Sequence, residues 1–431
     1  MIKYMNDLNE MRSYLLLWFT QLISGLGSAM TAYALVIWSY TQAGSALRTA
    51  ALMVCSYAPY VICSIFAGAL SDRWDKKKTM LVCDALAALS TLTVLLLLKN
   101  DALRIWHLYI VNAVSGLMNT FQQPASEVAT SALLKREYYQ KVGGLRYLSN
   151  SLNSILTPII ATAVMGLWGI GTVIAIDLCS FAIAFVILLL FIPIPKTEPK
   201  VAKESVLHSA AEGVRWLKAN PGIFHLMLFL AGINLVASMF NATLPAMILS
   251  KASQTALGTV NSVTGIAMLV GSILASFLPA PRSRVKAIWC CLMMSMCTEN
   301  FFLAFGNSSW VWCFGAVLGW IAIPAMNANL EAVNRLNIPI EIQGRVFAAR
   351  NSFQFFTIPV GYFLGGALVD QVFEPIMAVQ RPESILVRLF GDGKGSGAAF
   401  LFAALWIMGI CVCLIFRADR HIWKLESNRG D

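Results

Sequence analysis

The stretch Gly68-Ala-Leu-Ser-Asp-Arg-Trp-Asp-Lys-Lys-Lys78 places a cluster of charged side chains between two long apolar runs. Each of the flanking runs is long enough for an α-helix to cross the hydrocarbon core of a bilayer. A charged turn between two such runs marks a point where two transmembrane helices meet at the membrane surface. An ordinary basic turn of a membrane protein has the same appearance, so the rest of the chain decides what this turn means.

The composition predicts an all-α membrane protein. The chain has 431 residues, of which 58% are hydrophobic and only 13% are charged, whereas soluble proteins carry about 25% charged residues. No cleavable signal peptide is expected, because the first apolar run is longer than a signal h-region. We expect twelve spans, over residues 13–38, 48–70, 79–98, 105–124, 146–166, 170–192, 222–249, 257–279, 286–306, 309–330, 347–370 and 396–416.

The basic charge balance is a signal of membrane topology. A net charge of +10 would suggest nucleic-acid binding in a soluble protein. Here, most of the 32 Lys and Arg residues fall in segments that share one side of the membrane if the N-terminus is cytoplasmic. Because Lys and Arg are enriched in cytoplasmic loops, we expect both termini in the cytoplasm and no nucleic-acid partner.

A repeat divides the chain into two halves. Two segments, each followed by a proline, align at one constant offset: Gly143-Gly-Leu-Arg-Tyr-Leu-Ser-Asn-Ser151 with Pro158, and Gly344-Arg-Val-Phe-Ala-Ala-Arg-Asn-Ser352 with Pro359. We predict six-helix halves over residues 1–192 and 221–416. Residues 193–220 would form a cytoplasmic linker with a short amphipathic helix around Trp216, and residues 417–431 would form a cytoplasmic tail.

Four segments carry a resemblance to the major facilitator superfamily. The opening stretch resembles the signature Gly-x-Leu-(Ala/Ser)-Asp-Arg-x-Gly-Arg-Lys between helices 2 and 3, although Asp75 replaces its second Gly. Residues 17–27, 174–181 and 343–347 resemble the macrolide-efflux and enterobactin-exporter branch of the drug:proton antiporters. The resemblance implies two pseudo-symmetric halves with the substrate site between them near the membrane midplane.

The resemblance also implies a gating motif, which consists of Gly68, Asp72, Arg73, Lys76, Lys77, Gly344 and Arg345. In the family's pattern, Asp72 lies at the N-terminus of helix 11, where a carboxylate is stabilised by the helix dipole. Such a contact would favour one of two conformations without locking the protein in it. The alternative is that Asp72 only neutralises the cations beside it.

Ionisable residues inside membrane spans are costly and are therefore candidates for function. The proton-coupling candidates are Glu299, Asp177, Glu127 and Asp84. Glu299 is the leading one because it lies near mid-membrane. Asp84 follows Lys78 by six residues and is expected to brace the basic loop. For Asp177, a structural partner is as plausible as a proton site.

The four helices that line the cavity in this family carry no charged residue near their middles. Their polar residues predict a substrate cavity with Gln21, Asn112, Asn119, Gln122, Asn234, Asn241, Trp320 and Asn327 in its wall. We expect this cavity to be uncharged and to suit an amphiphilic, drug-sized ligand. Interhelical hydrogen bonding would also account for many of these residues.

The predicted function is proton-coupled efflux of a macrolide-like drug or a siderophore by alternating access, in the bacterial inner membrane. An importer for siderophores or lipids is the alternative, because the antiporter motif of helix 5 is weak around Pro158. A sensor built on a transporter scaffold is a different class. We expect no enzyme activity, no metal site and no cofactor beyond the proton gradient, and we expect a monomer. The ten cysteines fall inside predicted spans, where packing is their expected role.

Overall fold

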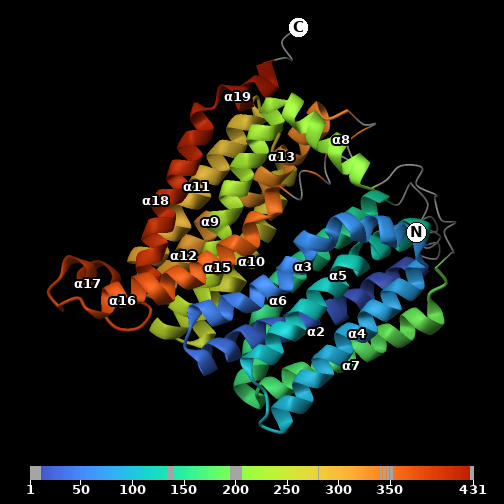
Figure 1. Cartoon of the computed structure of the whole chain (residues 1–431), viewed down its shortest axis with the longest axis horizontal. Coiled ribbons are helices and arrows are strands. Elements are labelled where there is room, and N and C mark those ends of the chain that lie inside the picture. Colours follow the sequence, from blue (N-terminus) through green and yellow to red (C-terminus); the bar gives the residue numbers. More distant parts are fainter. Residues whose placement is uncertain are drawn as a thin grey trace. The chain divides into compact units, whose positions relative to one another are not determined.

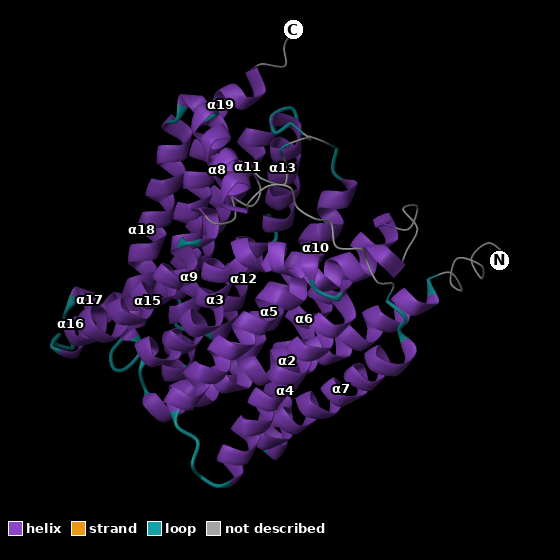
Figure 2. Ribbon diagram, turned by 45° about the vertical axis from the view of Figure 1, so that its right-hand side comes forward, coloured by secondary structure: helices purple, strands orange, loops and turns teal. Residues whose placement is uncertain are grey.

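The computed structural model describes residues 11–133, 139–194, 206–279, 281–339, 342, 346, 349 and 353–427. Every regular element in these ranges is a helix, as Figure 2 shows. The expected all-α fold is therefore confirmed. Contacts group the chain into two compact units, which we call the first unit (Met1–Trp38 and Cys55–Lys203) and the second unit (Ser39–Val54 and Glu204–Asp431).

The described helices of the first unit are long. In chain order they are α2 (Arg12–Ala43), α3 (Ala46–Arg73), α4 (Lys76–Lys99), α5 (Ile105–Leu133), α6 (Tyr139–Trp168) and α7 (Ile170–Phe191). The end of α2 and the start of α3 belong to the second unit. Within the first unit, α4 packs against both α5 and α7 (Figure 1).

The larger part of the second unit, Glu204–Asp431, begins with the expected short helix around Trp216, which is α8 (Val206–Ala219). The helices that follow are α9 (Pro221–Lys251), α10 (Gln254–Phe277), α11 (Arg284–Phe305), α12 (Ser309–Trp320), α13 (Ile323–Asn337), α15 (Thr357–Leu368) and α18 (Ser396–Ala418). Shorter elements are the π-helix η2 (Val369–Phe373), α16 (Glu374–Ala378), α17 (Ile385–Phe390) and α19 (Arg420–Ser427). Helix α9 packs against α15 and α18.

Eleven helical segments of the described chain are long and apolar enough to cross a membrane. Helix α5 is not among them, although it has 29 residues. The reason is its composition, because amide and hydroxyl side chains such as Asn112, Asn119 and Gln122 lower its hydropathy. The helix predicted to span residues 105–124 therefore exists, and it is unusually polar.

Side-chain caps fix where several helices begin. Asp75 accepts a hydrogen bond from the backbone N–H of Lys78 at 2.9 Å and starts α4. Ser253, Ser283 and Ser308 cap α10, α11 and α12 in the same way. Each cap satisfies one of the N–H groups that have no partner inside the helix, so the chain can turn within a few residues.

In both units, one glycine lets two long helices touch. A Cβ atom on Gly116 of α5 would lie 2.0 Å from the carbonyl oxygen of Ser56 on α3. A Cβ atom on Gly271 of α10 would lie 2.0 Å from the carbonyl oxygen of Ile321, at the end of α12. In the predicted repeat these are the second and fourth helices of the two halves. The corresponding pair of helices thus crosses closely in each half. The glycine lies on the fourth helix in the first half and on the second helix in the second half.

A carboxylate of the second unit holds the start of α3. Asp370 accepts hydrogen bonds from the hydroxyl of Ser45 at 2.5 Å and from the backbone N–H groups of Ala46 and Leu47 at 3.0 and 2.9 Å. It lies in η2, where the backbone widens to a π-helix, a feature often found at functional sites. A negative charge at this helix N-terminus is also favoured by the helix dipole.

We predict that Gly116→Ala and Gly271→Ala destabilise the protein, because the new methyl group would overlap a backbone oxygen that cannot move aside. The expected cost is about 1–3 kcal/mol, read as a lower melting temperature of the purified protein in detergent. Gly166→Ala is the matched control, since no atom lies within 4 Å of its added Cβ. Equal melting temperatures for all three variants would contradict the close crossings.

We further predict that Asp370→Asn lowers the melting temperature, because one charged acceptor at the start of α3 is replaced by a neutral amide. Hydrogen bonds to charged groups contribute about 1.5–3 kcal/mol, so the loss should be measurable in the same assay. Glu383→Gln serves as the control, because its exposed side chain makes no such cap. A melting temperature that Asp370→Asn leaves unchanged would argue against a stabilising role for the cap.

Candidate functional site

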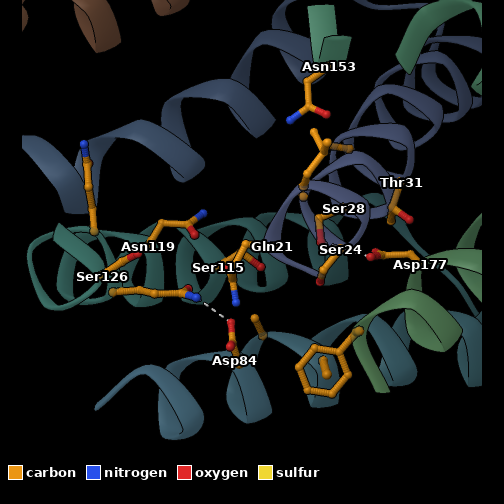
Figure 3. Close-up of a pocket in the computed structure, with 18 of the residues that line it drawn as sticks. Gln21, Ser24, Ser28, Thr31, Asp84, Ser115, Asn119, Ser126, Asn153 and Asp177 are labelled. Atoms are coloured by element: carbon orange, nitrogen blue, oxygen red, sulfur yellow. Dashed lines mark hydrogen bonds between the residues drawn. The ribbon is translucent and has the colours of Figure 1, made fainter. Parts of the chain in front are cut away.

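A cavity of about 910 Å³ lies among the helices of the first unit. Hydroxyl and amide side chains from α2, α5 and α6 form much of its wall, and α4 and α7 contribute the carboxyls of Asp84 and Asp177, as Figure 3 shows. Apolar side chains such as Leu17, Val111 and Phe181 lie between them. All predicted cavity residues from this unit line it: Gln21, Asn112, Asn119 and Gln122.

Asp84 of α4 points into this cavity. Its carboxylate accepts a hydrogen bond from the amide of Gln122 on α5 at 2.5 Å, and Gln21 of α2 lies beside it (Figure 3). We expected Asp84 to brace the basic loop near Lys78. That expectation is wrong, because the partner that the structure gives Asp84 is an amide from the cavity wall.

Asp177 of α7 forms a second acidic position. Its side chain is 4% exposed and accepts a hydrogen bond from the hydroxyl of Ser28 on α2 at 2.9 Å. Helix α2 can approach α7 here because residue 27 is glycine, whose Cβ would lie 3.0 Å from the Asp177 Cα. The segments 17–27 and 174–181, singled out separately in the sequence, therefore pack against each other and place this carboxyl at the cavity.

Glu127 and Arg146 also line the cavity and pair with each other. The Arg146 guanidinium lies 2.7 Å from the Glu127 carboxylate, and both side chains are more than half exposed. Arg146 is the only cation among the described residues that line the cavity. Because it is paired with Glu127, it leaves Asp84 and Asp177 as carboxyls with only hydroxyl and amide partners.

The cavity is thus acidic rather than uncharged. The expectation of an uncharged cavity is wrong for the first unit, because α4 and α7 each turn one carboxyl inward. Ser149 and Asn153 of α6 line the same cavity, although neither was among the residues predicted from the sequence. Ser149 follows Arg146 by three residues and Asn153 follows Ser149 by four. This spacing places all three on one helix face and is the signal that could have identified them.

In the second unit, the predicted residues Glu299 and Trp320 lie near each other, and neither lines either of the two described cavities. Glu299 of α11 is 5% exposed, and a Cβ atom on Gly319 of α12 would lie 3.0 Å from its carboxyl oxygen. The neighbouring Trp320 has a buried indole N–H that forms no well-aligned hydrogen bond. Glu299 therefore lies in the packing between two helices.

The other predicted cavity residues of the second unit lie apart from Glu299. The amide of Asn234 donates a hydrogen bond to the Gln354 carbonyl oxygen at 3.0 Å, which joins α9 to the segment that precedes α15. Asn241 and Asn327 are exposed. The structure thus gives Asn234 the interhelical role that was the alternative to substrate contact.

Only part of the predicted gating motif lies in the described chain. Lys77 donates to the carbonyl oxygens of Leu189 and Ile192 at 3.0 and 2.9 Å, at the end of α7. Lys76 donates to the Trp74 carbonyl oxygen at 3.0 Å. The side chains of Gly68, Asp72 and Arg73, and the residues Gly344 and Arg345, lie outside the described part. The latch between Asp72 and helix 11 stays a prediction.

Comparison with known proteins agrees with this architecture. The chain is 25% identical over 365 residues to macrolide efflux protein A of Streptococcus pyogenes, which covers 83% of this chain and 89% of the relative. It is 24% identical over 263 residues to the enterobactin exporter EntS of Shigella boydii, which covers 59% of this chain and 61% of the relative. These relatives support the efflux branch that the sequence resembles.

Solved structures show the same fold. A mutant of the nucleoside transporter NupG superposes with a TM-score of 0.72 at 13% identity, over 94% of this chain and 99% of the other. A bacterial homologue of the iron transporter ferroportin superposes with a TM-score of 0.67 at 14% identity, over 95% and 98% of the two chains. The family model described as Major Facilitator Superfamily matches residues 17–278. The chain is a membrane transporter rather than an enzyme, and it belongs to the Major Facilitator Superfamily.

Proposed function

We propose that this protein exports amphiphilic compounds that carry a protonated amine, in exchange for protons. One observation carries the proposal, namely the two inward-facing carboxyls, Asp84 and Asp177, in a cavity that holds no unpaired cation among its described residues. Macrolide-like drugs are the leading substrates. A siderophore is the second candidate class, because an enterobactin exporter is among the relatives.

The two carboxyls would bind a cation or a proton because their negative charge is poorly solvated in the cavity. A carboxylate that leaves water for a low-dielectric site loses on the order of several kcal/mol of hydration unless a positive charge compensates it. Hydroxyl and amide donors supply only part of that compensation. A cationic substrate or a proton supplies the rest, and both would compete for the same oxygens. Such competition is what an antiporter needs, because the arrival of one ligand favours the release of the other.

The size and lining of the cavity favour an amphiphile. A cavity of about 910 Å³ lies within the range of about 300–1,000 Å³ that accommodates drug-sized ligands. Trp18, Leu22 and Phe181 offer apolar contact, while Ser24, Ser115 and other hydroxyls offer hydrogen bonds. Strong anions such as sugar phosphates fit this site poorly, because they would face two carboxyls.

The proton gradient would drive transport without a bound cofactor. The protein would act as a monomer in the bacterial inner membrane. Both termini would lie in the cytoplasm, because most of its Lys and Arg residues fall in the segments that share a side with the termini, and cytoplasmic loops are enriched in Lys and Arg.

We predict that Asp84→Asn and Asp177→Asn each reduce export at least fivefold, because the amide keeps the shape but cannot exchange a proton or balance a cation. The measurement is accumulation of a labelled macrolide in cells that lack their own efflux pumps, at matched protein levels. Asp101→Asn is the control, since this exposed residue lies in the turn between α4 and α5. If both cavity variants export as well as wild type, the carboxyls do not carry the function.

We predict that cells with the wild-type protein accumulate less macrolide than cells without it, and that a proton uncoupler abolishes the difference. The reason is that export against a gradient stops when proton entry no longer supplies energy. A labelled siderophore tested in parallel separates the two substrate classes. Higher accumulation in cells with the protein would instead identify an importer, and a difference that survives the uncoupler would exclude proton coupling.

A further inference from the structure

A second hollow, separate from the acidic cavity, lies in the second unit where α11 begins and α18 ends. Its volume is about 450 Å³, and two cations and two indoles line it: Lys286, Trp289, Arg417 and Trp423. We call it the basic hollow. None of these four residues lines the acidic cavity.

The indole rings of the basic hollow are fixed in place. Trp289 donates its N–H to the Cys413 carbonyl oxygen at 2.9 Å, and Trp423 donates its N–H to the Arg417 carbonyl oxygen at 3.0 Å. Both bonds end on the last turns of α18. The guanidinium of Arg417 lies 4.9 Å from the centre of the Trp289 ring, within the range of a cation–π contact. The rings therefore wall the hollow and hold one of its cations.

The short helix α19 closes the hollow and is itself anchored. Glu426 accepts hydrogen bonds from the Ser283 hydroxyl and from the backbone N–H groups of Arg284 and Val285, at 2.5, 2.5 and 3.1 Å. These bonds cap the start of α11. At the other end of α19, Asp419 contacts His225 of α9 at 2.6 Å. Helix α19 thus stays in place beside the hollow, with Trp423 between its two anchors.

The basic hollow keeps a positive charge. The acids nearest along the chain, Asp419 and Glu426, are committed to His225 and to the start of α11. Within the described residues, no carboxylate lies within ion-pair distance of the Lys286 or Arg417 side chains. The site therefore attracts an anion, and its hydrogen-bond donors suit a phosphate group.

The surroundings identify which phosphate fits. Arg417 ends the membrane span of α18, and Leu414 and Ile415 just before it are 51% and 70% exposed. In a bilayer these side chains face lipid tails, while Trp residues at span ends lie at the level of the headgroups. A ligand with an anionic head and apolar chains matches both parts of this surface. We propose that the basic hollow binds the headgroup phosphate of an anionic phospholipid.

The test uses the purified full-length protein, stripped of lipid in detergent and examined by native mass spectrometry. The probes are phosphatidylglycerol, phosphatidylcholine and inorganic phosphate, added separately. We expect phosphatidylglycerol to bind roughly tenfold more tightly than phosphatidylcholine, in keeping with two cations near an anionic lipid. The variant Lys286→Gln/Arg417→Gln should lose this preference.

The control Lys218→Gln/Arg282→Gln removes the same charge from exposed residues outside the hollow and should keep the preference. Lys286→Gln alone is a second test variant, because its exposed side chain can change without disturbing the Trp289 contact. A preference that survives both test variants would overturn the proposal. So would equal binding of both lipids, or displacement of phosphatidylglycerol by inorganic phosphate at equal concentration.

Discussion

Inside a bilayer, a polar group has to find its partner within the protein, because lipid tails offer none. Three carboxyls of the described chain follow that constraint, and each one ties two helical segments together. Asp84 joins α4 to α5, and Asp177 joins α7 to α2. Asp370 caps the first turn of α3. The same groups that make the sequence costly to insert therefore decide which helices are neighbours.

The two units meet this constraint with different results. In the first unit, the partners of Asp84 and Asp177 face a cavity, so their carboxyls stay open to a ligand. In the second unit, Glu299 lies against Gly319 in a close contact between helices. The two units share the close glycine crossings at Gly116 and Gly271, but they place their buried carboxyls differently. The acidic cavity belongs to one unit.

Much of the fold follows from the sequence because span length and hydropathy are local properties. The rotation of each helix about its axis is not local, since packing sets it. Asp84 illustrates the difference: six residues of α-helix separate it from Lys78, which amounts to about 9 Å and a turn of roughly 240°. Closeness in sequence therefore predicted the basic loop as the partner of Asp84, whereas the structure gives Gln122. Similarly, no pattern in the sequence around Asp370 predicted a π-helix.

The first hairpin has a consequence for protein engineering. Its tip, Ser39–Val54, packs with the second unit although it lies early in the chain. Consider a chimaera that joins the N-terminal half of one relative to the C-terminal half of another at the linker. Its hairpin tip would come from one relative and the unit that packs against this tip from the other. The cap that Asp370 provides would then face residues it did not evolve with. Functional recombinants should therefore exchange residues 39–54 together with the C-terminal half, as a single inherited block.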